Sequence, residues 1–204
     1  MRIAAILTMT LLGGISLHAA DGKSVPLRSV AVCMHYEGDF AANNLARATA
    51  SKLFRGIGVA LDWAKPGSCP ADGIQIALGR NTPETLRPGA LAYALPSEGR
   101  SIRVFLDRIE TARPALAPHL LAYVLVHEIT HVIQGISYHS DHGVMKAHWD
   151  GRDLDRMQWD ELRFDQEDVA LIRLGLDKRA EVASAPQPST QTEVLLNPAA
   201  PPRF

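Results

Sequence analysis

Cysteine is scarce in this sequence of 204 residues, which contains only Cys33 and Cys69. Their separation is far longer than the Cys-x-x-Cys spacing of a thiol redox motif or a zinc-binding pair, so neither kind of site is indicated. Two cysteines of one domain often form a disulfide in an oxidising compartment, and two buried thiols that only pack are the alternative. We predict the disulfide.

A strong excess of either charge is also absent. The chain has 21 Lys and Arg residues against 22 Asp and Glu residues, a formal net charge of -1. Basic clusters or stripes of basic and aromatic residues, which attract nucleic acids and acidic membranes, do not occur. We therefore expect no nucleic-acid partner. The sequence also contains no internal repeat.

The long uncharged apolar run is confined to the N-terminus. Arg2 precedes apolar residues at 3–17, and Ala19 and Ala20 follow before the chain turns polar. This order is typical of a secretory signal peptide, which we predict at 1–20. No later segment is both long and free of charge, so we expect no stable membrane span after cleavage. The working protein is predicted to be exported, either periplasmic or secreted.

The remaining composition is that of an ordinary globular chain, with 47% hydrophobic and 21% charged residues. We predict one domain at 21–182, which is long enough to bury a sizeable core, and we expect a monomer. From 183 to 204 the chain is rich in Ser, Pro, Ala, Gln and Thr and has little to bury, which predicts a disordered tail.

The first half of the domain predicts a sheet with some parallel pairing. Apolar and β-branched runs predict strands at 29–34, 59–63 and 73–78. Between the first two, residues 42–57 repeat apolar positions at helical spacing, with Asp39 as the expected cap. A strand, a helix and a strand in this order are typical of a parallel crossover unit.

Two further strands are predicted at 91–95 and 101–106, joined by turn residues, so they form an antiparallel hairpin with one strand at the sheet edge. In the second strand, alternation predicts that three side chains point inward, Ile102, Val104 and Leu106. The same alternation predicts that three point outward, Arg103, Phe105 and Asp107.

An apolar helix follows, with Pro118 in its first turn and Gly135 at its end. Its apolar stripe consists of Leu120, Leu121, Val124, Leu125, Val132 and Ile133. A last helix is predicted to begin at Asp165, which caps it together with Asp168. Its packing residues are predicted to be Leu171, Ile172, Leu174 and Leu176.

The apolar helix carries His127, Glu128 and His131 in the pattern His-Glu-x-x-His. Positions four apart lie one above the other on a helix, so both imidazoles can reach one metal ion while the glutamate points beside it. Polar groups on a buried helix must be satisfied, and a metal ion satisfies the imidazoles at once. The alternative is a core helix with hydrogen-bonded histidines.

A zinc site of this kind needs a third protein ligand. The candidates after the helix are His139, Asp141, His142, His148, Asp150 and Glu161. A sharp turn at Gly135 would let a residue a few positions further on fold back under the metal, which favours His139. His142 is close enough to compete, and Asp150 has the spacing of proteases whose third ligand is a carboxylate on a second helix.

These residues, in this order, carry a family resemblance: His127, Glu128, His131, Gly135, His139 and the turn Gly143-Val144-Met145. The chain resembles the metzincin clan of zinc peptidases, in which a third histidine follows a glycine turn and a methionine turn lies beneath the metal. Metzincins usually place five residues between the second and third histidines, and here His131 and His139 enclose seven. The longer form, at 139–146, resembles exported bacterial metzincin-like proteins. Some metzincins carry a tyrosine two residues after the methionine, where this chain has Ala147.

The resemblance implies an α+β fold: a twisted mixed β-sheet of about four to five strands, a backing helix, an active-site helix and a C-terminal helix. It also implies that the edge strand at 91–95 pairs with an extended peptide or protein substrate.

The predicted function is that of a zinc metalloendopeptidase. His127, His131 and His139 would bind Zn²⁺ as neutral imidazoles and leave a fourth position for water, with Glu128 as general base. Two alternatives remain. One is a metzincin-like module that binds zinc without catalysis, and the other is a structural fold that binds no metal.

Overall fold

The computed structural model describes residues 27–36, 40–65, 67–95, 99–159 and 161–185. The predicted signal peptide at 1–20, the cap at Asp39, the turn residues 96–98 and the tail at 186–204 lie outside the described residues.

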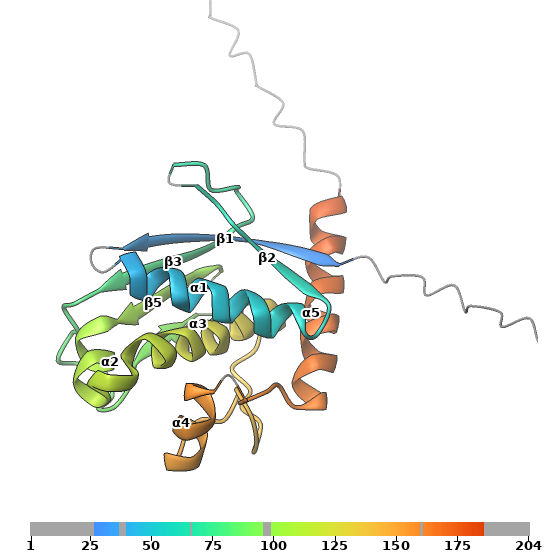
Figure 1. Cartoon of the computed structure of the whole chain (residues 1–204). Helices are drawn as coiled ribbons and strands as arrows, with labels where there is room; N and C mark the ends of the chain where they lie inside the picture. The colour runs from blue at the N-terminus through green and yellow to red at the C-terminus, as the bar shows by residue number, and fades with distance from the viewer. Residues whose placement is uncertain (1–26, 37–39, 66, 96–98, 160, 186–204) are drawn as a thin grey trace, which may run out of the picture.

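The described chain contains five strands and several helices (Figure 1). The strands are β1 (Arg28–Tyr36), β2 (Val59–Trp63), β3 (Ile74–Gly79), β4 (Ala92–Ala94) and β5 (Ser101–Phe105). The α-helices are α1 (Phe40–Arg55), α2 (Leu106–Ala112), α3 (Ala117–Gln134), α4 (Gly151–Gln158) and α5 (Gln166–Ser184), and the short 3-10 helix η1 (Pro114–Leu116) precedes α3.

The strands form one mixed sheet in the order β2-β1-β3-β5-β4. β1 pairs in parallel with β2 and with β3, and β3 pairs in parallel with β5. β4 pairs antiparallel with β5 and forms the sheet edge, which confirms the predicted hairpin and edge strand. The parallel unit β1-α1-β2 is also confirmed. The molecule is therefore of the predicted α+β class, with a five-stranded mixed sheet.

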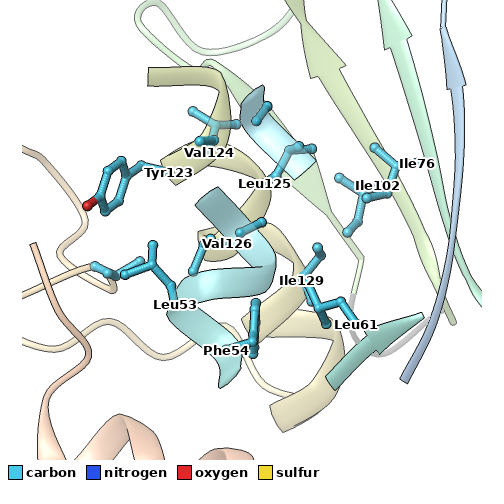
Figure 2. Packing of buried hydrophobic residues seen from close by; sticks show 14 of the residues in the cluster. Leu53, Phe54, Leu61, Ile76, Ile102, Tyr123, Val124, Leu125, Val126 and Ile129 are labelled. Atoms are coloured by element: carbon cyan, nitrogen blue, oxygen red, sulfur yellow. The ribbon is translucent and has the colours of Figure 1, made fainter. Parts of the chain in front are cut away.

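The core lies between the sheet and the pair α1 and α3 (Figures 1 and 2). In β3 the buried side chains alternate with half-buried ones, so one face of the strand is fully covered. Figure 2 shows side chains from α1, α3 and the sheet meeting in this layer, among them Leu53, Phe54, Leu125, Ile129, Ile76 and Ile102.

Helix α3 is buried around its whole circumference from Leu120 to Gln134. By length and composition, Pro114–Gln134 is the one helical segment of the described chain that is apolar enough to cross a membrane, and 78% of its apolar window is buried in the fold. A helix that is apolar all round is typical of a protein core. Pro118 lies in its first turn and Gly135 ends it in the left-handed conformation, with φ of 70°, as predicted.

Two predicted side-chain positions were wrong. Phe105 is buried, because the chain turns into α2 directly after β5 and the Phe105 ring packs 6.0 Å from the ring of Tyr93. Leu174 is 51% exposed, because α5 packs through Ile172 and Leu176 on another face. Helices α2 and α4 were not predicted. Helix α5 also runs to Ser184, two residues into the predicted tail.

The predicted disulfide between Cys33 and Cys69 is present, with 5.7 Å between the two Cα atoms. It joins β1 to the loop before β3. Gly73 packs against this bridge, since a Cβ atom there would lie 3.1 Å from each of the two sulfur atoms.

Helix α5 crosses the C-terminal end of α3 at Gly175, where a Cβ atom would overlap the carbonyl oxygen of Ile133. We predict that Gly175→Ala lowers the free energy of unfolding by about 2 kcal/mol, because the overlap outweighs the roughly 1 kcal/mol that alanine adds to helix stability. Gly151→Ala is the matched control, since Gly151 lies in α4 with no atom within 4 Å of the added carbon. Urea denaturation measures both variants. Equal stability of Gly175→Ala and the parent protein would contradict this packing.

Candidate metal centre

Helix α3 places His127 and His131 on successive turns, facing one point. Their Nε2 atoms lie 3.0 Å apart, and the two rings meet edge to face with centroids 4.7 Å apart. Both side chains are buried, at 8% and 6% exposure. The helical spacing therefore brings the two imidazoles together in the interior of the protein, as the sequence predicts.

His139 joins this pair from the loop after α3. Its Nε2 atom lies 3.2 Å from Nε2 of His131, and its ring stacks on His127 with centroids 5.1 Å apart. Among the described residues, the three histidines form a group whose candidate ligand atoms all lie within 4.8 Å of one another. The turn at Gly135 thus allows the loop to fold back beneath the helix.

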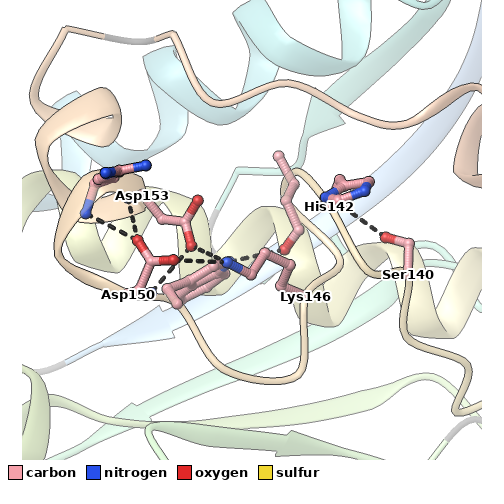
Figure 3. Close-up of polar contacts among 8 residues, drawn as sticks. Ser140, His142, Lys146, Asp150 and Asp153 are labelled. Atoms are coloured by element: carbon pink, nitrogen blue, oxygen red, sulfur yellow. Dashed lines mark hydrogen bonds and ion pairs between the residues drawn. The ribbon is translucent and has the colours of Figure 1, made fainter.

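The other candidates for a third ligand lie outside this group. The backbone carbonyl of His142 accepts a hydrogen bond from Oγ of Ser140 at 2.8 Å, and its side chain is exposed. Asp150 caps α4 and pairs with Lys146, with 3.1 Å between Oδ2 and Nζ (Figure 3). The remaining candidates, which are also exposed, are Asp141, His148 and Glu161.

Backbone carbonyls determine which nitrogen of each helical imidazole carries the proton. Nδ1 of His127 lies 3.0 Å from the carbonyl oxygen of Val144, and Nδ1 of His131 lies 3.1 Å from that of Ile136. A carbonyl oxygen only accepts hydrogen bonds, so each Nδ1 must be the donor. The neutral rings therefore direct the lone pairs of their Nε2 atoms toward each other.

The environment keeps these rings neutral. Burial, assisted by the charge of His131, lowers the pKa of His127 to about 3. Burial and the charge of His139 lower the pKa of His131 to about 4. Burial and the charge of His148 lower the pKa of His139 as well. At neutral pH the rings of His127 and His131 therefore keep their lone pairs available to a metal ion.

Facing lone pairs about 3 Å apart repel each other unless a cation lies between them. Three neutral imidazole nitrogens match the ligand set of a catalytic zinc site, in which a fourth position stays open. Hydrogen bonds from Nδ1 to backbone carbonyls are also the usual support of histidine ligands. The residues present therefore fit a zinc ion.

Glu128 lies beside this group and near the sheet edge. Its side chain is 8% exposed, and burial raises the pKa of its carboxyl to about 7. The backbone N–H of Ala94 in β4 donates a hydrogen bond to the carboxylate, and this bond partly offsets the effect of burial by lowering the pKa. A carboxyl group with a pKa near 7 can both accept and return a proton at neutral pH.

The loop beneath the three histidines is held by backbone hydrogen bonds. The N–H of Val144 donates to the carbonyl of Arg163 at 3.0 Å, and the N–H of Ser140 donates to that of Met145 at 3.1 Å. Gly143 has φ of 75°, and a Cβ atom there would overlap the carbonyl oxygen of Arg163. Only glycine fits this turn, and Met145 follows it with a completely buried side chain.

The N-terminus of α5 anchors the same loop. Oγ of Ser140, next to His139 in the chain, lies 3.2 Å from Oδ2 of Asp168, which also closes the capping box with Asp165. Asp168 is completely buried, and burial raises the pKa of its carboxyl group. The hydroxyl of Tyr138 donates to Glu167 at 3.0 Å. The capping box was predicted, and its connection to the metal centre was not.

A pocket of about 510 Å³ opens beside the metal centre. Trp149 forms part of its wall: the indole Nε1 donates to the carbonyl of Val144 at 3.2 Å, and its ring meets His127 edge to face at 5.5 Å. Neither this pocket nor α4 behind it was predicted from the sequence. The pattern Asp150-x-x-Asp153 is a signal that could have predicted α4, because it forms a capping box.

No protein-family model matches this sequence. A comparison with curated proteins finds no match either. Among solved structures, the chain is similar to the crystal structure of archaemetzincin from Methanopyrus kandleri, with a TM-score of 0.49 and 15% sequence identity. The superposition covers 74% of this chain and 96% of that chain. At this identity the similarity concerns the path of the backbone.

Proposed function

We propose that this protein is an exported zinc metallopeptidase of metzincin type, in which His127, His131 and His139 bind the metal ion and Glu128 is the general base. The observation that carries this proposal is the convergence of the three imidazole rings on one point. The Nε2 atom of His131 lies within 3.2 Å of Nε2 of both other histidines, and the pKa of each ring is lowered.

Zinc at such a site supplies Lewis-acid chemistry, since it makes water more acidic and polarises a substrate carbonyl. Glu128 accepts the proton of the attacking water and then donates it to the departing amine nitrogen. His127 and Glu128 are largely buried, and the pocket that they line gives water and a substrate access to them.

The edge strand supports a peptide as the substrate. The carbonyl of Leu91 accepts from the N–H of Phe105 at 2.9 Å, so alternation turns the backbone groups of Ala92 and Ala94 away from β5. The N–H of Ala94 already reaches Glu128. An extended peptide that adds to this edge would therefore pass beside the base, and such pairing uses mainly backbone groups.

The disulfide between Cys33 and Cys69 supports an exported protein, since such bonds persist in oxidising compartments. We include in the proposal the cleaved signal peptide at 1–20, a catalytic domain from 21 to the end of α5 and a disordered tail after α5. The proposal also includes a monomeric state without a membrane span or nucleic-acid partner.

The ligand set is tested by titrating the metal-free protein with zinc in competition with a chelating dye. We predict that His139→Ala weakens zinc binding more than about 100-fold, because it removes a ligand rather than a supporting group. His142→Ala and Asp150→Ala are the matched controls, and each should retain the parent affinity within about threefold. Loss of zinc from Asp150→Ala with retention by His139→Ala would move the third ligand to the carboxylate.

The role of Glu128 is tested by casein proteolysis with Glu128→Ala and the parent protein, each with its zinc content measured. We predict that the variant retains one zinc per chain and loses hydrolysis by about 10²–10⁴-fold, since general-base catalysis contributes this range. Unchanged hydrolysis in the variant would contradict the assignment of the base. Zinc-loaded parent protein that cleaves neither casein nor a peptide library would instead identify a zinc-containing binding module.

A further inference from the structure

The pocket beside the metal centre has an apolar wall. Helix α3 contributes Leu120 and Val124, and the segment after the methionine turn contributes Trp149, with Leu154 of α4 behind it. The opposite side is formed by the segment that leads into the edge strand, including Leu91. A pocket of about 510 Å³ with such walls accommodates a large apolar side chain of a peptide.

The charges around the pocket are unequal. Among the described residues that line it, Glu128 is the only carboxylate, whereas Arg87, Arg113 and Lys146 also line it. Lys146 is neutralised by ion pairs with Asp150 and Asp153 (Figure 3). The described residues provide no ion pair for the side chain of either arginine. These two arginines therefore carry the uncompensated positive charge of the pocket.

The chain segments that carry both arginines lie toward the N-terminal end of α3, away from the histidines. Leu120 precedes His127 by seven residues on α3, which corresponds to roughly 10 Å along the helix axis. Arg113 precedes α3 and directly follows α2. Arg108 of α2 donates hydrogen bonds to the carbonyls of Arg87 and Ala90 at 2.9 and 2.8 Å. These bonds hold the segment that carries Arg87 against α2.

The acidic groups of α2 are engaged elsewhere. Glu110 pairs with Arg80, with 2.8 Å between Oε1 and Nη2, and Asp107 accepts from the hydroxyl of Thr82 at 2.8 Å. Neither of them lines the pocket. The pocket thus runs from the metal centre, past an apolar wall, to a cationic end.

We propose that this pocket selects acidic peptide substrates: it receives a large apolar side chain next to the bond to be cleaved, and Arg87 and Arg113 attract a carboxylate that follows this side chain. The selection deepens the proposed peptidase function and rests on it. The carboxylate comes either from an Asp or Glu side chain or from the C-terminus of the peptide. Both sources present the same anionic group to the guanidinium groups.

The test is the binding of fluorescein-labelled peptides by fluorescence anisotropy, with Glu128→Ala as the background so that no peptide is cleaved. The peptides contain Leu-Glu, Leu-Gln or Leu-Lys within a Gly and Ala chain and have amidated C-termini. A further peptide without acidic side chains ends in Leu-Ala with a free carboxylate. We expect Leu-Glu to bind about three- to tenfold more tightly than Leu-Lys at low salt, since two exposed ion pairs contribute modestly, and the ratio to fall at high salt.

Arg87→Ala/Arg113→Ala in the same background should abolish this preference. The matched control is Arg55→Ala/Arg173→Ala, which removes the same amount of charge from exposed positions outside the pocket. This variant should keep the preference for the Leu-Glu peptide. If the free-acid peptide binds as tightly as amidated Leu-Glu, the terminal carboxylate also serves as a source. If it binds only as Leu-Gln does, the source is the acidic side chain.

Equal affinity for the Glu, Gln and Lys peptides, or a preference that survives the loss of both pocket arginines, would overturn the proposal. Failure of the peptidase function appears separately, as absence of zinc or of casein cleavage in the parent protein. The binding comparison does not depend on either of those results.

Discussion

The mutual repulsion of the facing Nε2 lone pairs of His127 and His131 is the constraint on which the site depends. Backbone carbonyls of Val144 and Ile136 hold Nδ1 of the two helical histidines, so their Nε2 atoms are left to face each other 3.0 Å apart. Two of the three histidines are buried where protonation is strongly disfavoured. Such an arrangement is stable when a cation lies between the imidazole Nε2 atoms. The fold holds the rings in this arrangement.

Two features hold the imidazole rings in place: the burial of α3 and the anchoring of the loop that follows it. Because α3 is buried along its length, His127, Glu128 and His131 are almost fully covered, and His127 and Glu128 also line the pocket. The loop folds back through the left-handed turns at Gly135 and Gly143 and is tied to α5 through Ser140 and Asp168. The short edge strand β4 also contributes, because the backbone N–H of Ala94 donates a hydrogen bond to Glu128. Glu128, the imidazoles and the sheet edge therefore meet at one place.

Much of this arrangement could be predicted from sequence, because it is encoded locally. Alternating or continuous apolar runs predict the strands, and the spacing of His127 and His131 predicts their common face. Gly135 predicts the end of α3 and favours His139 as the third member of the group. The capping box at Asp165 and Asp168 likewise depends on residues three apart.

The features that were missed or wrong depend on tertiary contacts. Phe105 lies where strand alternation places an outward side chain, yet the turn into α2 buries it beneath the antiparallel neighbour Tyr93. Leu174 fits an apolar helix pattern, but α5 packs at Gly175 and presents another face to α3. Arg87 and Arg113 line the same pocket from distant parts of the chain, and Arg108 of α2 donates a hydrogen bond to the carbonyl of Arg87. No periodicity or motif connects these positions.

Zinc K-edge X-ray absorption spectroscopy of the zinc-loaded protein would measure the number and kind of atoms bound to the metal. We expect three imidazole nitrogens and one oxygen in a four-coordinate shell at about 2.0–2.1 Å. Fewer than three imidazoles, or a shell made mainly of oxygen atoms, would contradict this expectation, because the three converging histidines would then not be the ligands.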